Sequence, residues 1–173
     1  MDVEGDHPPP DSLTSREPAV EDLLELCRAL NACRAEYVVI GGFAMRALGY
    51  DRRTMDVDLL IRTTRDNEAR VFRALESLPD KAVRELRAGD VDRYAVVRVA
   101  DEIVVDLMKS AGGLSYDRAR PEVEVRNVDG VAIPFASARL LWRTKAGTHR
   151  DKDAPDLLFL RHYFAARGED VPG

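Results

Sequence analysis

The sequence predicts an α/β or α+β fold, in which a mixed β-sheet carries helices packed on it. One observation is that apolar residues recur every three or four positions in some segments, as they do in amphipathic helices. Another is that other segments are short apolar runs rich in β-branched residues, which is typical of buried strands. Their order is helix, strand, helix, strand, helix, then strands, then two helices, and this order indicates a sheet covered by helices.

The helices are predicted from apolar spacing and from residues typical of helix ends. They cover residues 20–34, 43–48, 66–78, 137–146 and 153–166. Pro79 stops the third helix, and Ser137 can cap the fourth by accepting a hydrogen bond from a free backbone N–H group. Pro155 is tolerated in the first turn of the fifth helix, where its missing N–H group would have no partner.

The strands are predicted over residues 37–40, 57–61, 94–99, 103–108, 122–128 and 131–133. The first run, Tyr37-Val38-Val39-Ile40, is wholly apolar, which indicates a strand that is buried on both faces. Asp129-Gly130 separates the last two runs and is a typical tight-turn sequence, so these two strands are expected to form a hairpin.

The length and composition fit a single domain over residues 19–167. The chain has 173 residues, of which 45% are apolar, and is therefore long enough to bury a core. Residues 1–18 contain Pro8-Pro9-Pro10 and few apolar side chains. We expect a flexible tail there, because too little surface could be buried to offset the entropy of ordering. Residues 168–173 are expected to form a second flexible tail.

The charge and the cysteine content argue against several classes of protein. A net charge of −5 disfavours broad nonspecific nucleic-acid binding, although a local basic groove is compatible with it. Cys27 and Cys33 lie six residues apart on one predicted helix, on roughly opposite faces, so no disulfide is expected between them. No apolar run reaches transmembrane length, and the first residues lack a signal-peptide pattern. We therefore expect a cytoplasmic protein with no membrane partner.

Two acids at the start of the second predicted strand are the first candidates for chemistry. Asp56 and Asp58 are separated by one residue, so the two-residue period of a strand places both carboxylates on one face. Like charges this close favour a cation between them, and Mg²⁺ prefers carboxylates together with phosphate oxygens. Alone, such a pair is more often two solvent-facing acids. The apolar Leu59-Leu60-Ile61 that follows favours a central strand, and hence a metal site.

Gly41-Gly42 lies between a predicted strand and a predicted helix. Without Cβ atoms, the two glycines let the backbone approach a ligand closely, and the start of the helix offers free N–H groups to a phosphate. By itself, Gly-Gly is more often a simple turn. Its interpretation therefore depends on the acids that follow it.

A third acid, Asp106, lies in the apolar run Ile103-Val104-Val105-Asp106-Leu107. If this strand were next to the strand of Asp58, the Asp106 carboxylate would point at the same site. It could then help to hold metal and accept the proton of an attacking hydroxyl group. An acid that faces water fits the local sequence equally well.

Together these residues resemble the nucleotidyltransferase superfamily, the fold of DNA polymerase β and of the antibiotic adenylyltransferases. The superfamily pattern is Gly-Gly or Gly-Ser after a strand, then Asp-x-Asp, then a lone carboxylate on a later strand. The closer resemblance is to small bacterial members related to the AbiEii-type toxins, with Gly-Gly-x-Ala followed by Gly-x-x-Arg-x-Thr-x-Asp-x-Asp. The matching strings are residues 41–44 and 49–58, and the resemblance covers roughly residues 20–166.

The resemblance implies roles for individual residues. The catalytic and metal-binding residues would be Asp56, Asp58 and Asp106, with two Mg²⁺ ions or one that bridges the phosphates. The substrate would be ATP or another nucleoside triphosphate (NTP). It would be bound by Gly41, Gly42, Arg52, Thr54 and Lys145. Arg150 and Lys152, in a segment similar to an Arg-x-Lys-Asp-x-x-Asp-Leu element, would be weaker phosphate contacts. Asp153 and Asp156 are interpreted as structural residues that cap and brace the last helix.

The implied activity is transfer of a nucleoside monophosphate from the NTP to an acceptor hydroxyl, with release of pyrophosphate. The acceptor is left open: tRNA or another RNA, a protein or a small molecule. The resemblance also implies a component of a toxin–antitoxin or abortive-infection system, with a cognate antitoxin or a second subunit as partner. The alternative is a non-catalytic nucleotide- or partner-binding module. The clustered acids weigh against that alternative, because a module without catalysis has no physical need for them.

Overall fold

The computed structural model describes residues 15–173, and the first part of the predicted N-terminal tail, residues 1–14, lies outside the described residues. The helices are α1 (Val20–Ala32), α2 (Gly41–Ala47), α3 (Arg65–Leu75), α4 (Asp90–Tyr94), α5 (Tyr116–Ala119), α6 (Ala138–Ala146) and α7 (Ala154–Ala166). The strands are β1 (Tyr37–Ile40), β2 (Asp56–Ile61), β3 (Val96–Ala100), β4 (Val104–Met108), β5 (Ser110–Ala111), β6 (Leu114–Ser115), β7 (Val123–Val128) and β8 (Val131–Ala136).

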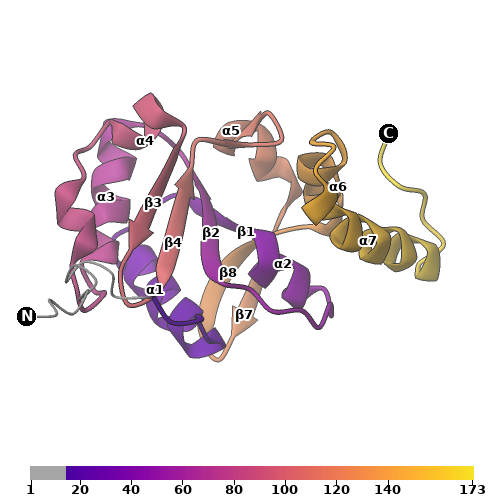
Figure 1. Ribbon diagram of the computed structural model, residues 1–173, viewed down its shortest axis with the longest axis horizontal. Coiled ribbons are helices and arrows are strands. Elements are labelled where there is room, and N and C mark those ends of the chain that lie inside the picture. The colour runs from indigo at the N-terminus through magenta and orange to yellow at the C-terminus, as the bar shows by residue number, and fades with distance from the viewer. Residues whose placement is uncertain (1–14) are drawn as a thin grey trace, which may run out of the picture.

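A six-stranded mixed sheet forms the centre of the fold, which confirms the predicted fold class. Its strand order is β3-β4-β2-β1-β8-β7. β2 runs antiparallel to β1 and parallel to β4, and β1 runs parallel to β8. The edge strands β3 and β7 are antiparallel to their neighbours. Figure 1 shows α3 and α4 at one end of the molecule and α6 and α7 at the other, with the sheet between them.

The two faces of the sheet have different roles. The hydroxyl of Tyr37 on β1 donates a hydrogen bond to Asn31 Oδ1 on α1 at 2.8 Å, so this face of the sheet carries α1. Ile61 is the register partner of Tyr37, and the side chains of this face join those of α1 and α3 in the apolar core. Because side chains alternate along a strand, Asp56 and Asp58 project from the opposite face. That face is bordered by the start of α2 and by α6 and α7.

Several element boundaries differ from the predictions. α2 begins at Gly41, so the two glycines form its first turn rather than a turn before it. Gly41 makes this direct transition possible because its φ is +65°, a value that favours glycine. β3 begins at Val96 rather than at Tyr94, since the preceding residues form α4 and Ala95 changes the chain direction with a φ of +67°. The short pair β5–β6 has no counterpart among the predicted strands.

Both described ends of the chain contact the folded part. Arg16 forms an ion pair with Asp22 at 2.6 Å and another with Glu102. At the other end, the indole N–H of Trp142 donates a hydrogen bond to the backbone carbonyl of Pro172 at 3.1 Å. The flexibility of residues 168–173 stays a prediction.

Two expectations from composition concern the cysteines and the membrane. Cys27 and Cys33 are both free, as predicted. Among the helices formed by residues 15–173, none combines the length and the apolar character needed to span a membrane.

Candidate active site

Three carboxylates converge on the face of the sheet that lies opposite α1. Asp56 and Asp58 project from β2, and Asp106 projects from β4, where it is the direct register partner of Asp58. An oxygen of each carboxylate lies within 4.8 Å of an oxygen of the other two. Since β2 and β4 are parallel neighbours, the sheet itself brings the third acid to the pair. Carboxylates in this arrangement have the donor atoms and spacing that a hard divalent cation requires.

The close approach of the acids changes their protonation. Burial, followed by the charges of Asp56 and Asp106, raises the pKa of Asp58 to about 7, despite an opposing effect of Lys145 and Lys152. The pKa of Asp56 is also raised, first by burial and then by Asp106. The negative charge of the cluster is therefore only partly compensated by the protein. A divalent cation between the carboxylates would stabilise their charged forms.

The two glycines leave room for the strand that carries the acids. A Cβ atom on Gly41 would lie 2.1 Å from Asp58 Oδ2, and a Cβ atom on Gly42 would lie 2.5 Å from Thr54 Oγ1. Thr54 is buried, and its hydroxyl donates a hydrogen bond to the backbone carbonyl of Asp56 at 2.9 Å. Thr54 therefore holds the start of β2 against α2. Both glycines are needed for this packing, whether or not a ligand is bound.

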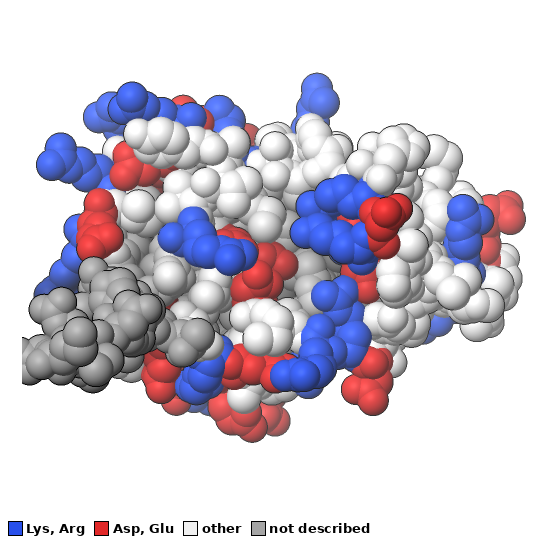
Figure 2. Space-filling view, viewed as in Figure 1, with Lys and Arg blue, Asp and Glu red and all other residues white. Residues whose placement is uncertain are grey.

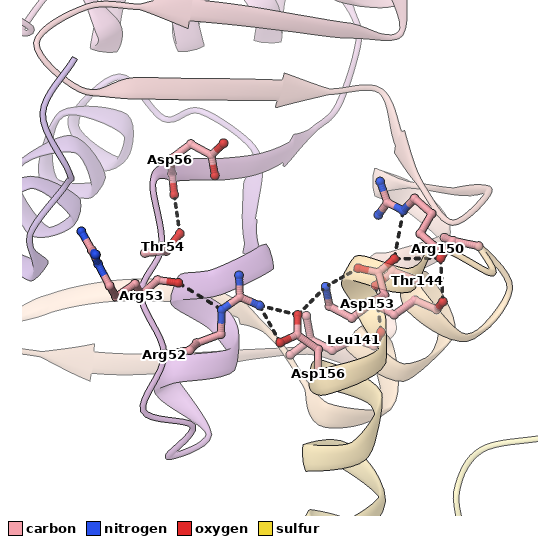
Figure 3. A network of polar contacts seen from close by, with 11 residues as sticks. Arg52, Arg53, Thr54, Asp56, Leu141, Thr144, Arg150, Asp153 and Asp156 are labelled. Atoms are coloured by element: carbon pink, nitrogen blue, oxygen red, sulfur yellow. Dashed lines mark hydrogen bonds and ion pairs between the residues drawn. The ribbon is translucent and has the colours of Figure 1, made fainter. Parts of the chain in front are cut away.

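Basic side chains form the opposite wall of the site. Arg52, from the segment between α2 and β2, pairs with Asp156 on α7, as Figure 3 shows. Lys145 on α6 pairs with the same carboxylate at 3.0 Å. The side chain of Asp156 is only 3% exposed, and that of Lys145 is 11% exposed. Asp156 therefore holds both cations in place, and Lys145 also pairs with Asp153 at 3.4 Å. Arg52, Lys145 and Arg150 thus share two carboxylates, which leaves part of their charge available to an anion.

The interpretation of Asp153 as a helix cap is wrong. Asp153 stands at the N-cap position of α7, but its side chain makes no capping hydrogen bond. Instead it accepts hydrogen bonds from the hydroxyl of Thr148 at 2.8 Å and from Nε of Arg150 at 2.9 Å, the latter visible in Figure 3. A carboxylate gains more from a charged donor than from a neutral backbone N–H group. Asp153 thus orders the loop between α6 and α7.

A pocket of about 280 Å³ lies between the acidic and the basic wall. Both glycines and all three acids line it, together with the basic residues Arg52, Arg98, Lys145, Arg150 and Lys152. The structure thus brings the predicted site residues together, except Thr54, which lies behind Gly42. Figure 2 shows acidic atoms near the middle of this face with basic side chains on either side. A second pocket of about 440 Å³ adjoins the first and shares Gly41 and Asp58 with it.

Arg98 is a residue of this site that was not predicted. Its Nε lies 2.9 Å from Asp106 Oδ1, and its Nη2 lies 3.0 Å from Asp106 Oδ2 and 3.3 Å from Asp56 Oδ2. Arg98 is the register partner of Asp106 in the antiparallel pair β3–β4. The sequence holds a signal for this position, because Val97 and Val99 alternate with it. Once the two strands form a hairpin, Arg98 must share a face with Asp106.

The fold is that of nucleotidyltransferase-like proteins. A proposed nucleotidyltransferase from Thermotoga maritima is similar over 83% of this chain and 92% of its own, with a TM-score of 0.55 and 15% sequence identity. An antigenic nucleotidyltransferase-like protein from Paracoccidioides brasiliensis is similar over 89% of this chain and 78% of its own, with a TM-score of 0.52 and 17% identity. No protein-family model and no curated protein matches the sequence. The likeness establishes the fold, and the case for an activity depends on the residues of this chain.

Proposed function

We propose that the protein is a Mg²⁺-dependent nucleotidyltransferase, which moves a nucleoside monophosphate from an NTP to an acceptor hydroxyl and releases pyrophosphate. The observation that carries this proposal is the convergence of Asp56, Asp58 and Asp106 in a pocket whose opposite wall is basic. Carboxylates suit divalent cations, and basic side chains suit phosphates. One pocket therefore combines the two kinds of contact that a metal–triphosphate complex requires.

The carboxylates fit Mg²⁺ by their own chemistry. They supply hard oxygen donors that lie within 4.8 Å of one another, and burial, followed by the charges of Asp56 and Asp106, raises the pKa of Asp58 to about 7. A bound cation would stabilise the charged form of this carboxylate. Asp56 and Asp58 would hold the ions, and Asp106 would complete the position of a second ion. Such ions, when bound, stabilise the charge that develops on the attacking and leaving oxygens of phosphoryl transfer.

The phosphates would be bound by the glycines and the basic wall. Gly41 and Gly42 line the pocket without side chains, so their backbone N–H groups can approach the β- and γ-phosphates closely. Lys145 and Arg52 would add positive charge to the same phosphates. Their shared contact with Asp156 orients both cations before the nucleotide binds, so less conformational entropy is lost on binding.

Asp106 would act on the acceptor. Its carboxylate would take the proton of the acceptor hydroxyl, whose oxygen then forms a bond to the α-phosphorus. The bond between the α-phosphorus and its bridging oxygen breaks, and pyrophosphate leaves in line with the attacking oxygen. Thr54 would contribute indirectly, because it fixes the backbone at Asp56.

We assign the second pocket to the part of the substrates that extends beyond the triphosphate. Its lining combines apolar residues such as Ile40 and Val96 with the polar residues Ser110 and Thr144. An RNA end such as that of tRNA, a protein hydroxyl and a small molecule are the acceptor classes to test. The motif string that resembles the AbiEii-type toxins favours a role in a toxin–antitoxin or abortive-infection system, with an antitoxin or second subunit as partner.

A non-catalytic nucleotide- or partner-binding module is the competing function. The observation in its favour is that Arg98 already neutralises Asp106, the acid that we assign to proton transfer. A module of this kind would bind an NTP in the same pocket without turnover. Release of pyrophosphate separates the two functions.

The test is transfer of label from α-labelled NTPs, with Mg²⁺, to cell extract separated into RNA, protein and small-molecule fractions. We expect label in one fraction together with pyrophosphate, and neither with Asp58→Ala. Leu158→Ala is a matched control on the exposed face of α7 and should behave as wild type. Equal pyrophosphate release by wild type and Asp58→Ala would refute the proposal. NTP binding without any transfer would favour the binding module.

A further inference from the structure

Arg98 covers the donor atoms of one acid in the cluster. Its guanidinium group engages both oxygens of Asp106, at 2.9 and 3.0 Å, and reaches Asp56 Oδ2 at 3.3 Å. Two parallel N–H···O contacts of this kind are among the stronger polar contacts in proteins. A metal ion that used Asp106 as a ligand would need the same oxygens, so the geometry places two cations in competition for one carboxylate.

The position of Arg98 allows it to leave without disturbing the core. It lies on the edge strand β3, and its side chain is 62% exposed, whereas that of Asp106 is 8% exposed. The neighbouring side chains Val97 and Val99 point into the core and anchor the strand. Among residues 15–173, its carboxylate partners are Asp106 and Asp56, both in the cluster. Rotation of the long side chain into solvent would therefore uncover the acids and break no other ion pair.

Arg98 divides the cluster into a covered and an uncovered part. Asp106 is covered, because both of its carboxylate oxygens accept hydrogen bonds from Arg98. Asp58 is not among the carboxylates that pair with Arg98, and its Oδ2 lies beside Gly41. The acid that stays open to a cation in the apo site is therefore Asp58, on the side of Gly41.

We propose that Arg98 is an internal counter-cation that covers Asp106 until a divalent ion takes its place. This inference rests on the proposed function, because it takes the three acids as the metal site. In the absence of nucleotide, a divalent ion binds first at Asp56 and Asp58. Asp106 becomes a ligand only when Arg98 has moved out, so Arg98 lowers the affinity of the apo protein for divalent ions and is a positioning residue.

The test is a Mn²⁺ titration of the full chain without nucleotide, in which free Mn²⁺ is measured by its electron paramagnetic resonance signal. Arg98→Gln should bind Mn²⁺ about threefold to fivefold more tightly than wild type, the effect of removing one partly exposed ion pair. Lys152→Gln is the matched control, because Lys152 affects the acids through its charge but forms no ion pair with them. It removes the same charge and should change the affinity by less than about twofold.

Further variants distinguish the outcomes. In an Asp106→Asn background, Arg98→Gln should have a smaller effect than in wild type, because only the longer contact of Arg98 with Asp56 remains to be removed. Arg98→Lys should give a Mn²⁺ affinity between those of wild type and Arg98→Gln, because lysine makes no bidentate pair. An equal increase in Mn²⁺ affinity in Arg98→Gln and Lys152→Gln would overturn the inference, because it would show a general effect of charge. Unchanged Mn²⁺ affinity in Arg98→Gln, with binding still abolished by Asp58→Asn, would overturn the inference and leave the proposed function intact. Absence of Mn²⁺ binding in both wild type and Arg98→Gln would overturn the inference and the proposed function together.

Discussion

Replacement of Gly41 by alanine tests whether the turn and the acids form one unit. The added Cβ would lie 2.1 Å from Oδ2 and 2.9 Å from Cγ of Asp58. Real Cβ contacts do not come closer than about 3 Å, so the carboxylate must move by about 1 Å. The φ of +65° at Gly41 adds strain for any L-residue, about 1–2 kcal/mol.

The two effects have different consequences. The strain should lower the free energy of unfolding by about 1–2 kcal/mol, as measured by urea denaturation. The displacement of Asp58 should weaken Mn²⁺ binding and lower the rate of pyrophosphate release by about 100-fold, because a shift of about 1 Å in a positioned group is sufficient for such a loss.

Gly49→Ala is the matched control for backbone strain. Gly49 has a φ of +101°, but an added Cβ would have no heavy atom within 4 Å. This variant should therefore lose stability and keep Mn²⁺ affinity and pyrophosphate release. If Gly41→Ala were destabilised like Gly49→Ala and retained wild-type Mn²⁺ affinity, the reasoning that links Gly41 to Asp58 would be refuted.

Two further predictions concern the charges of the site. The pKa of Asp58 is raised from 3.8 to about 7 in the folded chain. Between these pH values the folded chain binds more protons than the unfolded chain. The free energy of unfolding therefore falls as the pH rises from 3.8 to about 7, and the loss is complete above 7. Asp58→Asn should thus unfold at a higher temperature than wild type at pH 8 in EDTA, and the difference in unfolding temperature should be smaller at pH 5. Equal differences at both pH values would show that the pKa of Asp58 is not raised. Asp156→Asn removes the carboxylate that Arg52 and Lys145 share, and should cost about 3 kcal/mol in urea denaturation. The exposed Leu158→Ala on the same helix should cost less than about 0.5 kcal/mol, and equal losses would show that Asp156 does not hold the basic wall.

The distribution of charge explains how an acidic chain can carry a phosphate site. The net charge of −5 describes the whole chain and argues against broad nucleic-acid binding. The fold nevertheless gathers basic side chains from separate segments, among them Arg52, Lys145 and Lys152, on one side of a single pocket. Local concentration of charge, rather than net charge, determines which ligand the pocket favours.

The sequence by itself determined the features that depend on neighbouring residues. The period of two along a strand places Asp56 and Asp58 on one face, and the apolar run after them indicates a central strand. The break at Gly41-Gly42 marks the change from strand to helix, although the helix starts at Gly41 itself. Backbone geometry over a few residues decides each of these features, so local pattern is sufficient to predict them.

Only the tertiary structure decided which distant residues meet. The parallel pairing of β2 with β4 places Asp106 beside Asp58, and the antiparallel pairing of β3 with β4 places Arg98 on Asp106. The docking of α7 brings Asp156 to Arg52, a contact that no local pattern indicates. Strand order and helix docking depend on how the whole apolar core packs. For this reason the acid pair was visible in the sequence, whereas the contact of the counter-cation with Asp106 depended on strand pairing and the support of the basic wall depended on the docking of α7.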